Sequence, residues 1–117
     1  MRILICGSRN FDDEQAIQAL LAQYDPAEDT IIEGAAPGAD TLAFLVGRKL
    51  GFSVDVYPAD WNKYGRRAGY VRNKQMLDEG RPDIVHAFPV GRSVGTRMMI
   101  KLAQDAGVQV IVHEVTQ

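Results

Sequence analysis

The chain has 117 residues, of which 46% are hydrophobic, and its formal net charge is -2. This length suits one domain with a buried core, so we expect residues 1–117 to form a single domain. The near-neutral charge disfavours long-range attraction to nucleic acid or to an anionic membrane, and we expect neither as a partner.

Targeting and redox signals are weak in this sequence. The single cysteine, Cys6, excludes an internal disulfide. No apolar run reaches the roughly 18 residues that a membrane-spanning helix needs. The N-terminal apolar stretch meets a glycine and an acidic segment too early for a secretory signal. We therefore expect a cytoplasmic protein.

Five short β-branched runs predict buried strands, and the segments between them have helical periodicity. The runs cover residues 3–6, 30–33, 53–57, 83–88 and 108–113. The apolar stripes of three predicted helices are Ile17, Leu20, Leu21 and Tyr24, then Leu42, Leu45, Val46 and Leu50, then Met99, Leu102, Ala103 and Ala106. Asp12 with Gln15 resembles a capping box, and Gly51, Gly80 and Gly107 are suited to end helices.

This alternation predicts an α/β, Rossmann-like, doubly wound sheet of about five parallel strands with helices on both faces. In such sheets ligands bind beyond the carboxyl ends of the strands, where the strand order reverses. The loops that follow the predicted strands are therefore the places to look for chemistry.

The loop after the first strand, residues 7–11, contains Gly7, Ser8 and Arg9. The glycine permits close approach of a ligand, and the serine and arginine suit phosphate oxygens. A tight turn with an exposed arginine explains the same residues equally well.

The loop after the second strand, residues 33–40, is built of small residues and proline between Glu33 and Asp40. Free amides at the start of a helix favour an anion, so we predict that Gly34, Ala35 and Gly38 contact phosphate. The loop lacks both the glycine spacing of dinucleotide folds and the lysine of a P-loop.

The stretch from residue 57 to residue 70 is predicted to be the longest irregular segment. We expect Trp61 or Tyr64 to stack on a base, and Lys63, Arg66 and Arg67 to meet phosphate. The alternative is a solvated loop with an aromatic anchor beneath it.

In the helix that follows, Met76 and Leu77 need the core, which places Asn73 on or beside the buried face. An asparagine there needs hydrogen-bonding partners, and Arg72 lies at the edge of the same face. Both residues cap a neighbouring loop or reach a ligand.

The loop after the fourth strand, residues 88–96, has the composition of a phosphate cradle before an amphipathic helix. Its candidate ligand residues are Gly91, Ser93, Gly95 and Thr96. His86 is expected to be a packed, hydrogen-bonded core residue. No cluster has metal-ligand spacing, and we expect neither a metal nor another cofactor.

Four segments in this order, ILICGSRNF, IIEGAAPGADTLA, RRAGYVRNKQMLDEGRPD and AFPVGRSVGT, resemble the SLOG superfamily of bacterial and phage proteins. Within it the chain is most similar to the YspA, cpYpsA-related family, and more distantly to the LOG-type phosphoribohydrolases. The resemblance implies a Rossmann-like fold, a nucleotide-derived ligand and a homodimer or higher homo-oligomer.

The same resemblance implies a catalytic arginine in an R-x-x-x-M motif, which Arg72 and Met76 match. A second motif, G-T-x-x-E, is only partly matched, because Met99 stands at the glutamate position after Gly95 and Thr96. Methionine neither stabilises an oxocarbenium ion nor activates water, and Met99 fits the core.

These features favour a domain that binds a nucleotide or nucleotide-derived, phosphate-bearing ligand as a sensor or for sequestration. The alternative is a nucleoside monophosphate N-glycosidase, in which Arg72 anchors phosphate and Glu33 or Asp40 acts on the sugar, with Asp60 behind them. A flavodoxin or response-regulator domain is disfavoured, because Cys6-Gly7-Ser8 replaces an acidic pair after the first strand.

Overall fold

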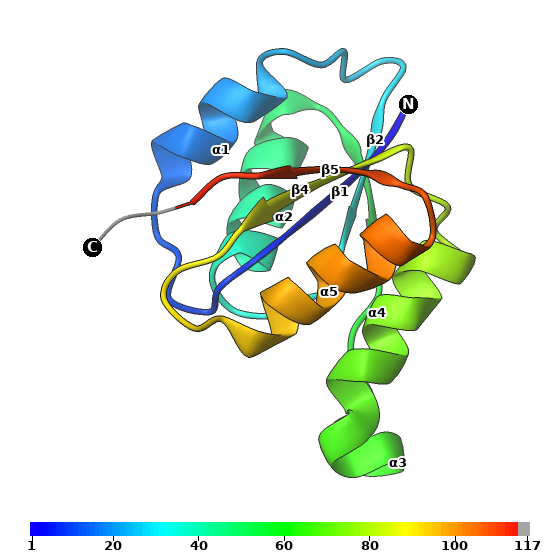
Figure 1. Ribbon diagram of the computed structural model, residues 1–117. Coiled ribbons are helices and arrows are strands. Elements are labelled where there is room, and N and C mark those ends of the chain that lie inside the picture. Colours follow the sequence, from blue (N-terminus) through cyan, green and yellow to red (C-terminus); the bar gives the residue numbers. More distant parts are fainter. Residues whose placement is uncertain (115–117) are drawn as a thin grey trace.

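The structure, a computed structural model, describes residues 1–114 as a five-stranded parallel sheet with helices on both faces (Figure 1). The strand order is β3-β2-β1-β4-β5. The strands are β1 (Arg2–Gly7), β2 (Thr30–Glu33), β3 (Ser53–Val56), β4 (Ile84–Phe88) and β5 (Gln109–Val112). The predicted α/β, doubly wound arrangement is confirmed.

The helices form two layers. Helices α1 (Glu14–Leu21) and α2 (Ala39–Leu50) cover one face, and α4 (Ala68–Asp78) and α5 (Val94–Asp105) cover the other. A four-residue helix, α3 (Trp61–Tyr64), and a 3-10 turn, η1 (Gly65–Arg67), precede α4. Figure 1 shows that α3 and the start of α4 project from the body of the molecule.

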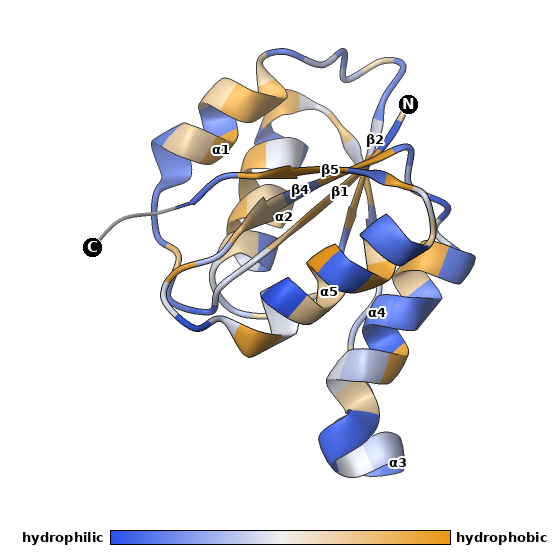
Figure 2. Ribbon diagram, viewed as in Figure 1, coloured by the Kyte–Doolittle hydropathy of each residue, from blue (hydrophilic) through white to orange (hydrophobic). Residues whose placement is uncertain are grey.

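The alternation of β1 explains why both faces need helices. Ile3 and Ile5 pack with α1 and α2, whereas Leu4 and Cys6 pack with α4 and α5. All four are buried, and Figure 2 shows the apolar colour running along the central strands. Each buried aliphatic side chain contributes about 1.5–3 kcal/mol relative to an exposed one. The core therefore lies on both sides of β1.

Three local predictions were wrong. The stripe of α2 is buried through Ala43 and Val46, while Leu45 and Leu50 are exposed, because the close approach to β2 occurs at small residues such as Gly47. The cap of α1 is Asp13, whose carboxylate accepts from the Ala16 N–H at 3.1 Å, in place of the Asp12 capping box.

The third error concerns the stretch from residue 57 to residue 70, which is largely helical. The Asp60 carboxylate accepts from the Lys63 N–H at 3.0 Å and so caps α3. An aspartate three residues before a helical amide is a recognised N-terminal signal. The aromatic and cationic side chains of this stretch are therefore held on a folded arm.

His86 is packed and hydrogen-bonded, as expected. One of its ring nitrogens, Nε2, lies 2.8 Å from the Tyr24 hydroxyl and the other, Nδ1, lies 2.9 Å from His113 Nε2. His113 also stacks on Phe88 with 4.4 Å between ring centroids. Burial lowers the pKa of His86 to about 4, so the pair is neutral near pH 7 and ties β5 to β4.

Residues 1–114 contain no helix that is both long and apolar enough to cross a membrane.

Candidate functional site

A cavity of about 590 Å³ lies at the carboxyl ends of the central strands. It is lined by the loop after β1, by the loop after β4 with the first turn of α5, and by one side of α4. From β1 the chain crosses to β2 on one side, while β4 pairs with β1 on the other. The cavity therefore occupies the point of strand-order reversal, where open α/β sheets bind ligands.

The first loop presents a hydroxyl and an arginine to this cavity. Gly7, Ser8 and Arg9 all line it. Ser8 Oγ accepts from the Asn10 N–H at 3.1 Å, which leaves its own O–H free to donate to a ligand. Gly7 is required for packing, because a Cβ there would lie 2.6 Å from Ala39 Cβ and 2.7 Å from the Phe88 carbonyl oxygen.

The loop after β4 ends in a helix whose first amides are open. The first backbone bond within α5 runs from the Arg97 N–H to the Ser93 carbonyl, at 3.0 Å. Among the described residues, no side chain caps this end; Ser93 Oγ instead donates to Thr96 Oγ1 at 2.7 Å. The N–H groups of Val94, Gly95 and Thr96 thus remain available, and the helix dipole favours an anion there.

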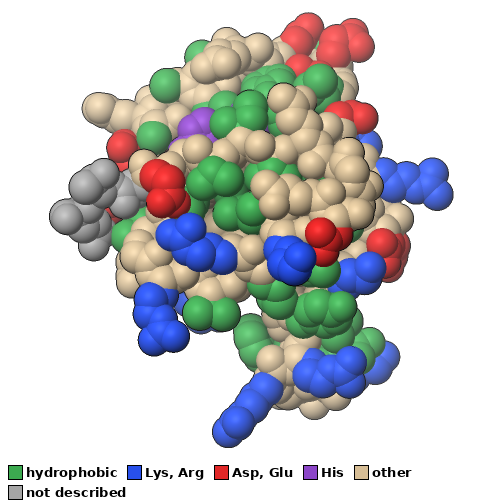
Figure 3. All heavy atoms as spheres, in the orientation of Figure 1, with side chains coloured by type: hydrophobic (Ala, Val, Ile, Leu, Met, Phe, Trp, Pro, Cys, Tyr) green, Lys and Arg blue, Asp and Glu red, His purple; other side chains and the backbone are tan. Residues whose placement is uncertain are grey.

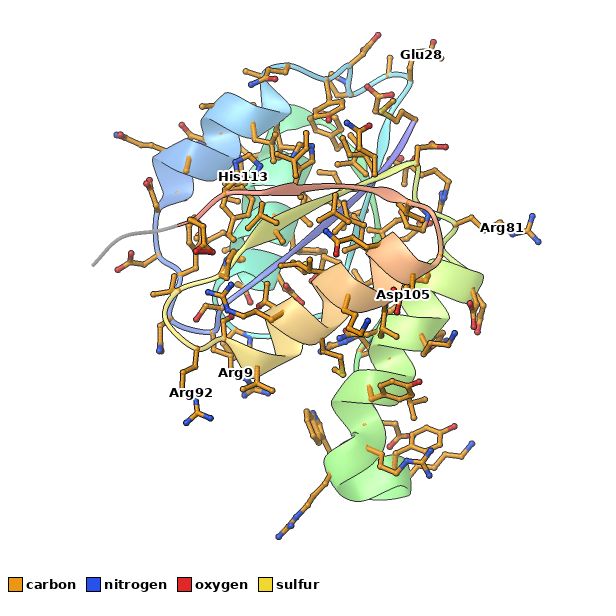
Figure 4. The ribbon with its side chains drawn as sticks, viewed as in Figure 1. Arg9, Glu28, Arg81, Arg92, Asp105 and His113 are labelled. Atoms are coloured by element: carbon orange, nitrogen blue, oxygen red, sulfur yellow. The ribbon has the colours of Figure 1, made fainter. Side chains whose placement is uncertain are left out.

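A residue that the sequence analysis missed holds this loop in place. Arg97 donates through Nε to the Arg92 carbonyl at 3.0 Å and through Nη2 to the Gly91 carbonyl at 2.9 Å. A cation in the first turn opposes the helix dipole, and this unfavourable position was the available signal of a specific structural role. Arg92, the arginine within this loop, lines the cavity with Arg9, and Figure 4 shows both beside the start of α5.

Helix α4 supplies the third wall. Asn73 is buried and has hydrogen-bonding partners, as a polar side chain on the buried face requires. Its Oδ1 accepts from Arg72 Nε at 2.9 Å, and its Nδ2 faces the Gly95 carbonyl at 3.4 Å. Arg72 Nη1 also donates to the Gly34 carbonyl. These bonds join α4 to the loops after β2 and β4, and leave Nη2 of Arg72 for a ligand.

The loop after β2 does not offer its amides to the cavity. The Gly34 and Ala36 N–H groups donate to Asp40 Oδ2 at 3.1 and 3.3 Å, and the Ala35 N–H donates to Glu33 Oε2 at 2.7 Å. The carboxylates of Glu33 and Asp40 therefore already satisfy these amides. Of the predicted residues of this loop, Asp40 lines the cavity, whereas Gly34, Ala35 and Gly38 do not.

Glu33 and Asp40 consequently occupy different places. Glu33 is 1% exposed and borders a separate shallow hollow with Phe44 and Val56, so the structure does not bring it to the cavity. Asp40 is 4% exposed and lines the cavity. The bonds that residues 1–114 give to Asp40 both go to Oδ2, which leaves Oδ1 for a ligand.

The aromatic candidates also separate. Trp61 lines the cavity, while Tyr64 and Arg67, on the same projecting arm, do not line it. Met99 is 1% exposed and packs with Met76 and Ala103, as its apolar character predicted, and it also lines the cavity. The position of the glutamate in the hydrolase motif therefore carries a buried apolar side chain here.

The two buried carboxyls make stability depend on pH. Burial raises the pKa of Glu33 from 4.5 to about 7 and that of Asp40 from 3.8 to about 6, against the lowering effect of Arg72 and backbone N–H groups. The folded protein thus binds more protons than the unfolded chain between about pH 4 and pH 7. Its free energy of unfolding falls as the pH rises through this window.

We expect Glu33→Gln to flatten this fall and to raise the free energy of unfolding at pH 8 by about 1–2 kcal/mol. The glutamine oxygen can still accept from the Ala35 N–H. Denaturant titrations at a series of pH values measure the effect. Glu79→Gln, at an exposed position beyond α4, removes the same charge and is the control. Equal pH profiles for the wild type and Glu33→Gln would contradict the expectation.

Comparisons with known proteins agree with the resemblance seen in the sequence. The profile of the YspA, cpYpsA-related SLOG family matches residues 1–64. The chain is also 41% identical, over 118 residues, to the Gene 61 protein of Mycobacterium phage D29, in an alignment that covers 94% of each chain. The chain therefore belongs to the YspA, cpYpsA-related SLOG family.

Proposed function

We propose that this protein binds a nucleotide or nucleotide-derived ligand through its phosphate, as a sensor or sequestering domain. The observation that carries the proposal is the convergence, on one cavity, of the open amides of α5, the Ser8 hydroxyl and arginines from three segments. The cavity volume of about 590 Å³ lies within the range of about 300–1,000 Å³ usual for small-molecule sites.

Each part of a nucleotide has a matching wall. The phosphate fits the α5 amides, with Arg9, Arg72 and Arg92 supplying positive charge. Asp40 Oδ1 is suited to accept hydrogen bonds from sugar hydroxyls. Trp61, which also lines the cavity, offers a flat surface to a base. The Gly34, Ala35 and Ala36 amides of the loop after β2 are held by Asp40 and Glu33 and do not contact the ligand.

The test is to extract small molecules from the purified protein for mass spectrometry, and to titrate it with ribonucleoside monophosphates by calorimetry. We expect an intact nucleotide-type compound to be released, and binding to at least one monophosphate. Recovery of no phosphate-bearing compound, together with no heat of binding to any monophosphate, would overturn the proposal.

A second candidate function is hydrolysis of the N-glycosidic bond, and the specific observation that favours it is Asp40. This carboxyl is buried at the cavity wall with one free oxygen and a pKa of about 6, which suits general acid-base chemistry near neutral pH. The opposing observation is the replacement of the motif glutamate by Met99.

Asp40→Asn separates the two functions. The asparagine oxygen can retain both backbone hydrogen bonds, so we expect ligand binding to persist within about tenfold. If the protein is a hydrolase, release of free base, followed by chromatography, falls by at least about 100-fold in this variant. A wild-type protein that releases no base identifies it as a binding domain. Unchanged release in Asp40→Asn removes Asp40 from the mechanism.

A further inference from the structure

The arm formed by residues 61–70 has a charge and a shape that a mononucleotide site does not use. Residues 61–77 contain five Lys or Arg residues and no carboxylate. The arm projects from the body, and on the face in Figure 3 it carries cationic and apolar side chains and no acidic one. Its aromatic residues are exposed: Trp61 by 51%, Tyr64 by 40% and Tyr70 by 43%.

The cations of the arm form a cluster without carboxylate partners, whereas four of the ten Lys and Arg residues elsewhere in residues 1–114 are paired. Arg2, Lys74, Arg97 and Lys101 each lie within 4 Å of a carboxylate. Within residues 1–114, Lys63, Arg66 and Arg67 pair with no carboxylate; the single acid at the base of the arm, Asp60, caps α3. Three exposed, unpaired cations on a short projection create a local positive field in a chain of net negative charge.

The arm is also continuous with the cavity. Trp61 and Gly69 belong to both, and the Trp61 Cη2 atom lies 3.8 Å from the position that a Cβ would take on Gly69. The Trp61 ring thus leans over the start of α4 at the rim. Lys63 Nζ lies 5.1 Å from the centre of the Tyr64 ring farther along. A ligand that leaves the cavity past Trp61 meets a path of aromatic faces and cations.

We propose that the arm binds the strand of a single-stranded polynucleotide whose terminal nucleotide occupies the cavity. This inference rests on the proposed function, because the cavity must accept a nucleotide. Aromatic faces interleaved with cations bind unpaired strands without regard to sequence, by stacking and by contact with successive phosphates. A duplex is disfavoured, because its stacked bases do not reach Trp61 or the cavity.

The test compares two charge-reversed proteins. One carries Lys63→Glu, Arg66→Glu and Arg67→Glu on the arm. The other carries Arg48→Glu, Lys49→Glu and Arg81→Glu, at exposed cations of the α2 end and the α4-β4 turn; Figure 4 shows Arg81 at the far end from Arg9 and Arg92. Both change the net charge equally. Binding of 5′-phosphorylated, fluorescently labelled DNA and RNA oligonucleotides of increasing length is measured by anisotropy.

We expect wild-type affinity to rise with length until the arm is covered, at about 4–8 nucleotides. At about 0.1 M salt, the arm triple should bind these oligonucleotides at least about tenfold more weakly than the control triple. Its affinity should also fall less steeply with salt concentration, by the amount expected for the loss of about two phosphate contacts. Trp61→Ala should weaken binding about tenfold, and Trp61→Phe should restore most of it. The DNA and RNA series show which sugar the strand carries.

Calorimetry with ribonucleoside monophosphates separates this proposal from the one on which it rests. The arm proposal alone would be refuted if monophosphates bind but oligonucleotides of every length bind no more tightly than they do. It would also be refuted if monophosphates bind and oligonucleotides bind equally well to both triples. Failure of both ligand types would refute both proposals. Loss of self-association in the arm triple, without oligonucleotide binding by the wild type, would make the arm a protein interface and also refute the proposal.

Discussion

Arg72→Met is expected to weaken nucleotide binding by about ten- to a hundredfold. Arg72 reaches the cavity from α4, with Nε and Nη1 held by Asn73 and the Gly34 carbonyl. These bonds fix the guanidinium plane before a ligand arrives, so little entropy is lost when Nη2 meets phosphate. A hydrogen bond between charged groups contributes about 1.5–3 kcal/mol, which corresponds to the expected loss.

Calorimetric titration with the monophosphate that binds the wild type best measures this loss. Lys74→Met is the matched control, because Lys74 lies on the same helix but points to solvent and pairs with Asp78 at 3.9 Å. It should bind like the wild type. Circular dichroism should show both variants folded. Wild-type affinity in folded Arg72→Met would mean that Arg72 only braces the loops after β2 and β4.

Gly38→Ala is expected to lower the free energy of unfolding by at least about 3 kcal/mol. Gly38 has φ 84° and ψ -126°, a conformation that only glycine adopts readily. A Cβ on it would also lie 2.1 Å from the Ser8 carbonyl oxygen. This contact is with backbone, so the loop after β1 must move, and ligand binding should weaken as well.

Gly65→Ala measures backbone strain without a steric clash, so the difference between the two variants gives the steric part of the Gly38→Ala effect. Gly65 has φ 56° and ψ -131°, a similar backbone conformation, but a Cβ there would meet nothing within 4 Å. We expect it to cost about 1–2 kcal/mol, from backbone strain alone. Chemical denaturation of the two variants gives the comparison. Equal destabilisation would show that the approach of Gly38 to Ser8 places no demand on the fold.

The fold was predictable because its signals are local and repeat along the chain. Each buried strand is a short β-branched run, and their alternation with helices fixes a parallel sheet. The predicted strand ends differ from the observed ones by at most one residue, as at Val56 and Ile84. The stripe of α2 was mispredicted because burial there follows the approach of Gly47 to Ile31, a contact between distant segments.

The site was predictable in part. Asn73 was expected on the buried face of its helix, in need of partners, and it has them in Arg72 and the loop after β4. Glycine and small residues identified the loops but not the direction of their amides. That direction depends on contacts that the sequence does not reveal. Glu33 and Asp40 satisfy the amides of the loop after β2, while the amides at the start of α5 stay open.

The central claim is that the loops after β1 and β4 bind one phosphate-bearing ligand together. Amide chemical shifts of the isotopically labelled protein, recorded during titration with the ribonucleoside monophosphates, test it directly. The account predicts saturable shifts in residues 7–10 and 91–97 with the same dissociation constant. Shifts confined to the hollow beside Phe44 and Val56, or different constants for the two loops, would contradict it.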